Sequence, residues 1–163
     1  NNKIKNPWYY EMQQLGYNYR LNDIQASLGI SQLSKIDKFI NKRRKISLKY
    51  DYAFRNLKNC KAIHKQFRDI SSNHLYILRI NFKKLKFSRA ELMLNLLERG
   101  IITQVHYIPI IFHPFYKKNY KRDKFEIIKA IKYYDECLSL PLFYDLTSSM
   151  QNKVIYEIKR LID

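Results

Sequence analysis

Two strand-like segments and the helix between them strongly limit what this chain can fold into. Residues Leu75–Phe82 (LYILRINF) are rich in β-branched and aromatic side chains, which predicts a strand. A capping box at Ser88–Glu91 (SRAE) predicts a helix that stops at Gly100, and Ile101–Tyr107 predicts the next strand. A strand, a helix and a strand in this order require a small sheet with helices packed on it.

Helical patterns surround this centre. We expect a first helix from Asn22, as its N-cap, to Leu33, and a longer one over residues 34–57. Further helices are expected over residues 123–137 and after Thr147, with a weak strand at 62–64 and an extended segment at 138–143. The chain is therefore predicted to be α+β, with long helices followed by a small mixed or antiparallel sheet packed with helices.

Residues Gly16–Leu33 (GYNYRLNDIQASLGISQL) join a loop to the first of these helices. The loop holds an amide, Asn18, and a guanidinium, Arg20, next to a helix N-terminus, a combination suited to binding an anion, phosphate above all. The same letters also fit a surface turn before an ordinary amphipathic helix. The pattern alone leaves both interpretations open.

The formal net charge of +17 is compatible with nucleic acid, an anionic membrane surface or an anionic small substrate. Lysines are spread along every segment, and clusters occur only at Asn41–Lys45 (NKRRK) and Tyr116–Lys124 (YKKNYKRDK). Diffuse charge also results from a lysine-rich residue usage with solvated faces. A basic nucleic-acid-binding module with interleaved tyrosines remains an alternative, although no zinc, RRM or helix-turn-helix signature is present.

Several function classes are disfavoured by what the sequence lacks. No apolar run approaches the ~20 residues that cross a bilayer, and no signal peptide is visible. Cys60 and Cys137 lie far apart without metal-ligand spacing, so we expect reduced thiols in a cytoplasmic protein. His64 and His113 lack a companion at such spacing, so no metal is expected. The chain begins at Asn1 without a methionine, which we interpret as a segment of a longer chain.

Five motifs in a fixed order resemble the DegT/StrS-type sugar aminotransferases, which use pyridoxal phosphate (PLP) on a fold-type-I scaffold. These are the G-x-N-x-R-[LM] motif at Gly16–Leu21, SSNHLYIL at Ser71–Leu78, QVHYIP at Gln104–Pro109, HPFYKK at His113–Lys118 and LSLPLF at Leu138–Phe143. The opening PWYYEMQQLGYNYRL and the VHYIP segment most resemble the members that aminate a UDP-linked 4-keto-6-deoxy sugar for pseudaminic acid.

This resemblance implies the C-terminal part of such an enzyme, with residues 1–57 as an interface loop and connecting helices and residues 58–163 as a small α/β capping domain. It also implies a homodimer with a shared active site, a nucleotide-sugar substrate and glutamate as amino donor. A membrane partner is not expected, and the resemblance disfavours a nucleic-acid partner. In the family, a lysine upstream forms a Schiff base with PLP, and no segment here resembles that lysine loop. We therefore expect no catalytic residue in this chain and no transamination by the isolated fragment.

The resemblance assigns cofactor binding to Asn18 and Arg20. Asn18 matches the asparagine that reaches the PLP phosphate of the neighbouring subunit, and Arg20 matches the arginine of the same loop. A neutral amide gives a directional hydrogen bond and a guanidinium pairs with phosphate. A salt bridge within the fold is an equally weighted alternative for Arg20.

For the substrate, His106 and Tyr107 match the family segment beside the nucleotide-sugar. Phe115 and Tyr116 match an aromatic pair suited to stacking on a sugar or nucleobase. Ile111 stands where the family commonly has a histidine, which removes one polar contact from the expected pocket. His74 is expected to support the sheet rather than to contact ligand.

A third interpretation takes the chain as a truncated gene product that acts only as an interaction or dimerisation domain. It accounts for the missing lysine segment as well as the aminotransferase interpretation does. Upstream coding sequence continuing in frame would separate the two.

Overall fold

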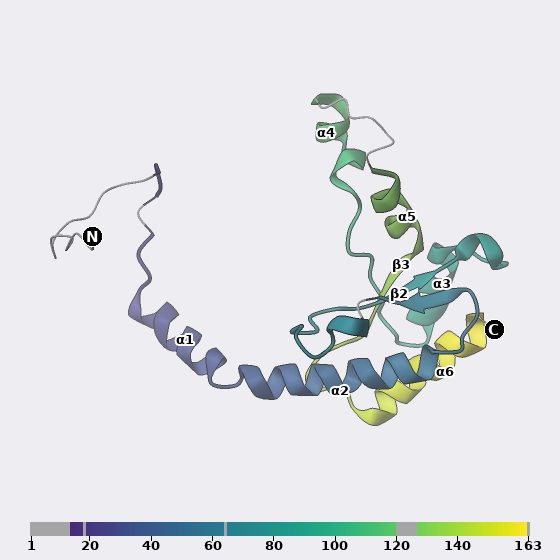
Figure 1. Cartoon of the computed structure of the whole chain (residues 1–163), viewed down its shortest axis with the longest axis horizontal. Helices are drawn as coiled ribbons and strands as arrows, with labels where there is room; N and C mark the ends of the chain where they lie inside the picture. Colours follow the sequence, from purple (N-terminus) through teal and green to yellow (C-terminus); the bar gives the residue numbers. More distant parts are fainter. Residues whose placement is uncertain (1–13, 18, 64, 120–126, 163) are drawn as a thin grey trace, which may run out of the picture. The chain divides into compact units, whose positions relative to one another are not determined.

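The computed structural model describes residues 14–17, 19–63, 65–119 and 127–162, which fall into two compact units, residues 1–35 and 36–163. The described residues form six α-helices and one three-stranded sheet (Figure 1). The helices are α1 (Asp23–Leu33), α2 (Ile36–Phe54), α3 (Arg89–Glu98), α4 (Pro114–Asn119), α5 (Ile128–Glu136) and α6 (Ser148–Ile162). This confirms the α+β prediction.

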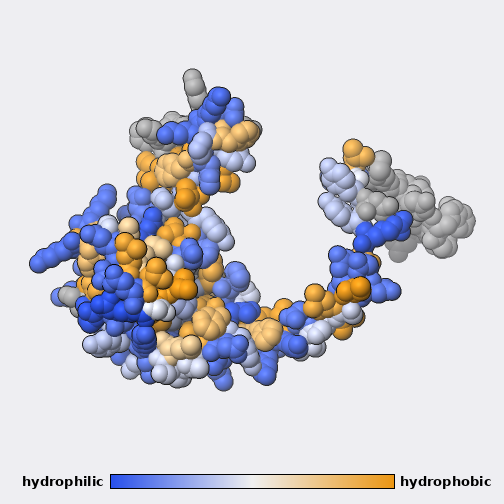
Figure 2. All heavy atoms as spheres, turned by 180° about the vertical axis from the view of Figure 1, so that it is seen from behind, coloured by the Kyte–Doolittle hydropathy of each residue, from blue (hydrophilic) through white to orange (hydrophobic). Residues whose placement is uncertain are grey.

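The first unit consists of an extended segment leading into α1. The Asn22 side chain accepts a hydrogen bond from the Gln25 N–H at 2.9 Å, and the Gln25 side chain accepts one from the Asn22 N–H at 3.2 Å. This reciprocal box fixes the start of the helix and confirms Asn22 as the N-cap. None of the described residues of α1 is buried, and Figure 2 draws its exposed apolar side chains as orange spheres.

The second unit is built on an antiparallel sheet in the order β1 (Cys60–Ala62), β2 (Tyr76–Ile80), β3 (Cys137–Leu140). Leu78 of the central strand lies opposite Ala62 on one side and Leu138 on the other. Side chains of β2 alternate between a fully buried face and a half-buried face. Since successive residues of a strand point to opposite faces, one face of the sheet lies in the core and the other is only partly covered.

The core lies between the buried face of the sheet and helices α2, α3 and α6, and α2 and α6 run side by side (Figure 1). Its largest fully buried side chains include Tyr50, Tyr76, Leu78, Ile80, Leu92, Leu96, Leu138 and Ile158. Burying each of the aliphatic ones contributes about 1.5–3 kcal/mol. The Tyr50 hydroxyl, which would be costly to bury without a partner, donates to the Pro141 carbonyl at 3.1 Å.

The boundaries of α3 and α6 follow the local signals in the sequence. Ser88 and Glu91 form the expected capping box, and Gly100 ends the helix at φ 72°, a conformation that favours glycine. Thr147 Oγ1 accepts a hydrogen bond from the Met150 N–H at 3.2 Å, as expected for the cap of α6. Val154, Ile158 and Ile162 of that helix are buried, and Leu161 is partly buried.

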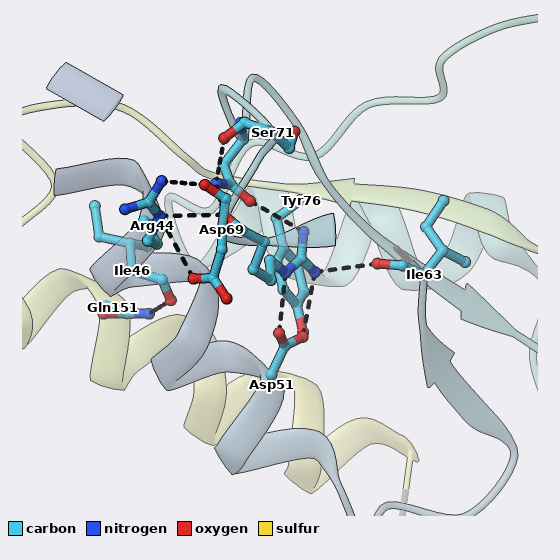
Figure 3. A network of polar contacts seen from close by, with 10 residues as sticks. Arg44, Ile46, Asp51, Ile63, Asp69, Ser71, Tyr76 and Gln151 are labelled. Atoms are coloured by element: carbon cyan, nitrogen blue, oxygen red, sulfur yellow. Dashed lines mark hydrogen bonds and ion pairs between the residues drawn. The ribbon is translucent and has the colours of Figure 1, made fainter. Parts of the chain in front are cut away.

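A polar network fixes the segment between β1 and β2 against α2 (Figure 3). Asp51 of α2 accepts two hydrogen bonds from Arg68, at 2.9 and 3.2 Å, and one from the Tyr76 hydroxyl at 3.0 Å. The Arg68 guanidinium also donates to the Ile63 carbonyl at 3.1 Å. Arg44, about two turns of α2 before Asp51, donates to the carbonyls of Arg68 and Asp69.

The strand predicted over residues 101–107 is wrong. In this segment Gln104 alone forms a bridge, to Ser139, through two backbone hydrogen bonds of 2.8 and 3.2 Å. The chain therefore touches the free edge of β3 at one point and turns away. Residues 138–143 are strand only as far as Leu140, and the first strand lies at Cys60–Ala62 rather than 62–64. Among the described residues, no helix has the length and apolar character to cross a membrane.

Candidate functional site

The loop before α1 presents Arg20 to solvent. Among the described residues, Arg20 makes no hydrogen bond or ion pair, so the alternative of a salt bridge within the fold receives no support from this part of the chain. Tyr17 and Tyr19 on either side pack edge to face, with ring centroids 5.9 Å apart. Asn18 lies outside the described residues. The loop thus offers an exposed guanidinium next to an aromatic pair.

In the second unit, His106 is held at two points. Its Nδ1 lies 2.8 Å from the Ser139 hydroxyl, and its carbonyl accepts a hydrogen bond of 3.2 Å from the Tyr133 hydroxyl of α5. Ser139 is buried in β3, and the bridge between Gln104 and Ser139 brings the His106 segment up to that strand. Burial raises the pKa of Tyr133, with the neighbouring Cys137 as a second cause, so this phenol remains a hydrogen-bond donor.

His106 and Ser139 line a pocket of about 170 Å³ at the edge of β3. The other lining residues are His74, Leu75, Ile102, Gln104, Leu140, Pro141 and Leu142. Two imidazoles, an amide and a hydroxyl supply both donors and acceptors, and aliphatic side chains supply the walls. Such a lining suits a polar, uncharged group such as part of a sugar, whose hydroxyls require both kinds of partner.

Three of the sequence motifs contribute to this pocket. His74 comes from SSNHLYIL, Gln104 and His106 from QVHYIP, and Ser139 from LSLPLF. Sequence reasoning identified only His106 and assigned His74 to supporting the sheet, whereas His74 is exposed and lines the pocket. The usable signal was that each motif carries at least one polar residue, and all of these residues lie at the edge of β3.

The remaining site residues from the sequence lie elsewhere. Tyr107 is 73% exposed and packs edge-on against the ring of His106, with centroids 4.7 Å apart. Phe115 and Tyr116 lie on α4, where they form an edge-to-face pair at 5.3 Å. None of these three aromatic residues is among the described residues that line the pocket. Ile111, at the position of the family's histidine, lies half-buried in a short 3-10 turn over Ile110–Phe112.

One of the two basic clusters has a structural role. Arg43 donates from Nε to the Ser72 carbonyl at 2.9 Å, and Arg44 donates to the carbonyls of Arg68 and Asp69. Both guanidinium groups of the Asn41–Lys45 cluster are therefore used to hold the segment between β1 and β2. Part of the second cluster, residues 120–124, lies outside the described residues. Within the described ranges, no group of three or more His, Cys, Asp or Glu is placed to bind a metal ion.

Comparison with known proteins gives a consistent result. The profile of the DegT/DnrJ/EryC1/StrS aminotransferase family matches residues 2–159. The chain is 35% identical over 157 residues to the uncharacterized protein MJ1066 of Methanocaldococcus jannaschii, covering 95% of this chain and 40% of that protein. It is 36% identical over 144 residues to the UDP-4-amino-4,6-dideoxy-N-acetyl-beta-L-altrosamine transaminase of Helicobacter pylori, covering 87% of this chain and 37% of the transaminase.

Solved structures show the same fold. The chain superposes on Helicobacter pylori PseC, an aminotransferase involved in pseudoaminic acid biosynthesis, with a TM-score of 0.78 and 31% identity over 97% of this chain and 42% of that one. It also matches the PLP form of the putative sugar aminotransferase Spr1654 of Streptococcus pneumoniae, with a TM-score of 0.77 and 28% identity over 94% and 39%. The chain spans about 40% of the length of the curated relatives that it matches.

Proposed function

The chain belongs to the DegT/DnrJ/EryC1/StrS aminotransferase family, and on this premise we propose that it is part of a PLP-dependent aminotransferase acting on a nucleotide-linked 4-keto-6-deoxy sugar. Glutamate is the proposed amino donor, and the proposed assembly is a cytoplasmic homodimer with a shared active site. The observation that carries the proposal is the match of the family profile to residues 2–159. The likeness to a transaminase of a UDP-linked amino sugar supports the substrate class.

The loop before α1 fits a phosphate monoester. The Arg20 guanidinium is exposed, offers several N–H donors in one plane and makes no ion pair with the described residues. We assign Arg20 and Asn18 to holding the phosphate of PLP. When bound, PLP would supply the carbonyl carbon that carries an amino group from donor to sugar.

The proposed task of the second unit is to orient the sugar. The hydrogen bond between His106 Nδ1 and the Ser139 hydroxyl fixes the ring, so that Nε2 is the atom left to interact with ligand. Tyr133 fixes the backbone of the same residue. Because both anchors belong to regular elements, β3 and α5, His106 presents a positioned polar atom instead of a mobile one. The aromatic rings of Tyr107, Phe115 and Tyr116 are assigned to contacts with the nucleotide-sugar.

The cofactor assignment is tested in the intact protein expressed from its natural start. We expect Asn18→Ala and Arg20→Ala each to weaken PLP retention about tenfold, measured by absorbance of the bound cofactor after dialysis. Lys35→Ala, which removes one positive charge at the end of the same unit, is the matched control and should leave retention unchanged. Unchanged PLP affinity in both loop variants would refute the cofactor assignment.

The substrate assignment is tested with His106→Gln and Ser139→Ala. We expect the KM for the nucleotide-sugar to rise about tenfold while the KM for glutamate stays within a factor of two. An equal rise in both constants would show that these residues act on the whole site or on stability. No conversion of any nucleotide-linked keto sugar by the intact protein would overturn the proposal itself.

The alternative functions gain little from the structure. Two of the four cations of the Asn41–Lys45 cluster, Arg43 and Arg44, donate to backbone carbonyls, which weakens the case for a nucleic-acid surface at this cluster. The interaction-domain interpretation predicts an intact protein that binds no PLP, so the cofactor measurement separates it from the aminotransferase.

A further inference from the structure

Two adjoining hollows lie beside α5, on the face of the sheet that points away from the core. One measures about 450 Å³ and the other about 310 Å³, and they share Asn81, Lys132 and Glu136. The first is also lined by Phe82, Lys83, Ile128, Ile131 and Asp135, and the second by Asn59, Cys60, Lys61 and Arg79. None of these residues lines the His106 pocket.

The pairing of β1 with β2 places two positively charged residues side by side in this site. Lys61 of β1 lies directly opposite Arg79 of β2, so both side chains stand on the same face of the sheet. Arg79 donates from Nε to Glu136 of α5 at 2.9 Å, which brings that helix over this face. Like charges opposite each other in a sheet are destabilising, and Lys61 and Arg79 both line the smaller hollow.

The charges in the two hollows are not balanced. Lys61, Arg79, Lys83 and Lys132 face two carboxylates, Asp135 and Glu136. Glu136 is already paired with Arg79. Among the described residues, Lys61, Lys83 and Lys132 have no carboxylate within ion-pair distance. Within the described part of the chain, three ammonium groups therefore line the two hollows without a carboxylate partner, and a bound anion would supply one.

The larger hollow adds an apolar wall to these charges. Phe82 and Ile131 are half-buried, and Ile128 is 51% exposed, so all three present hydrophobic surface to the hollow. The amide side chain of Asn81 offers hydrogen bonds at the junction of the two hollows, and that of Asn59 offers them in the smaller one. A ligand that carries both phosphates, for the lysines, and a flat ring, for Phe82, would match both parts of this lining. Together the hollows are of the size that encloses a small ligand.

We propose that this α5 hollow is a second binding site, for a nucleoside diphosphate, separate from the His106 pocket. The ligand's phosphates lie against Lys61, Lys83 and Lys132, and its base packs on Phe82 and Ile131. The site does not depend on the proposed transaminase activity, because none of its residues is assigned to the cofactor or the sugar.

The test is isothermal titration of the intact protein with ADP. Lys61→Ala and Lys132→Ala should each weaken binding about fivefold, and the double variant about 25-fold. Lys159→Ala, which removes the same charge from an exposed position on α6, should change the affinity less than twofold. Lys132→Arg should retain most of the affinity, which excludes a folding defect at that position.

Three results would overturn the proposal. The first is the absence of saturable ADP binding. The second is equal weakening by Lys159→Ala, which would show a response to net charge alone. The third is loss of ADP binding in His106→Gln, which would place the nucleotide in the sugar pocket instead of the α5 hollow.

Discussion

Removing the Asp51 carboxylate should destabilise the second unit strongly, because it leaves the Arg68 guanidinium buried without its counter-charge. The two side chains are 13% and 6% exposed, so solvent screens the pair little. Breaking such a pair by truncating one partner costs about 3–5 kcal/mol. Tyr76 adds to the loss: burial and the Asp51 carboxylate raise its pKa, so it stays a protonated donor and would lose its acceptor.

Hydrogen exchange of the β2 amides measures this effect in the intact protein, because those amides exchange only when the core opens. Asp51→Ala should accelerate their exchange roughly a hundredfold to several thousandfold, at about 1.4 kcal/mol per factor of ten. Asp69→Ala is the control, since Asp69 lies 3.9 Å from Arg44 and is 91% exposed, so its loss should cost under about 0.5 kcal/mol.

A triple variant separates the ion pair from packing. Asp51→Leu combined with Arg68→Met and Tyr76→Phe removes all three polar groups together, and it should cost much less than Asp51→Ala alone. The reasoning is refuted if Asp51→Ala accelerates exchange less than tenfold, or if the triple variant is the less stable of the two.

Two further predictions concern the core and a helix start. Leu138→Ala should lower the free energy of unfolding by about 2–5 kcal/mol, because Leu138 is fully buried. Leu94→Ala, at an exposed site of α3, is the control and should lower it by less than about 0.5 kcal/mol. Exchange of the β2 amides measures both variants, and similar losses of stability would contradict the assigned core. Hydrogen bonds from Ser88 lower the pKa of the Glu91 carboxyl below its ordinary 4.5, so its stabilising effect is complete above that pH and is lost as the pH falls through the lower folded-state pKa. The thermal midpoint of Glu91→Gln should therefore lie below that of the wild type at neutral pH, and the two midpoints should converge as the pH falls below 4.5; a difference that persists in acid would exclude the cap.

The features predicted well from the sequence are those decided within a few residues. The caps at Asn22, Ser88 and Thr147 need only a side chain and the amides of the following turn. The strand expected over 101–107 failed because extended propensity does not supply a partner strand. At that edge only Gln104 pairs, with Ser139. The Asp51–Arg68 pair was likewise unpredictable, because it depends on how the segment before β2 folds back on α2.

Part of the candidate site could likewise be predicted from the sequence, and part depends on contacts between distant segments. Resemblance placed His106 in a ligand-facing segment, and the structure places it beside Ser139. The contribution of His74 depends on the antiparallel pairing of β2 with β3, which brings the start of one strand to the end of the other. No spacing within a single segment reveals that contact. The α5 hollow was hidden for the same reason, since Lys61, Lys83 and Lys132 come from three separate elements.

The order of strands in the sheet has a consequence for synthesis of the protein. Leu78 of the central strand pairs with Ala62 of β1 and with Leu138 of β3, so the whole of α3, α4 and α5 is made before the second partner of β2 exists. Closing so long a loop is entropically costly and slows folding. Until β3 and α6 leave the ribosome, the apolar face of β2 has no complete cover, and the nascent chain is open to aggregation in that interval. Residues 137–162, which hold β3 and α6, thus decide when the whole second unit can fold.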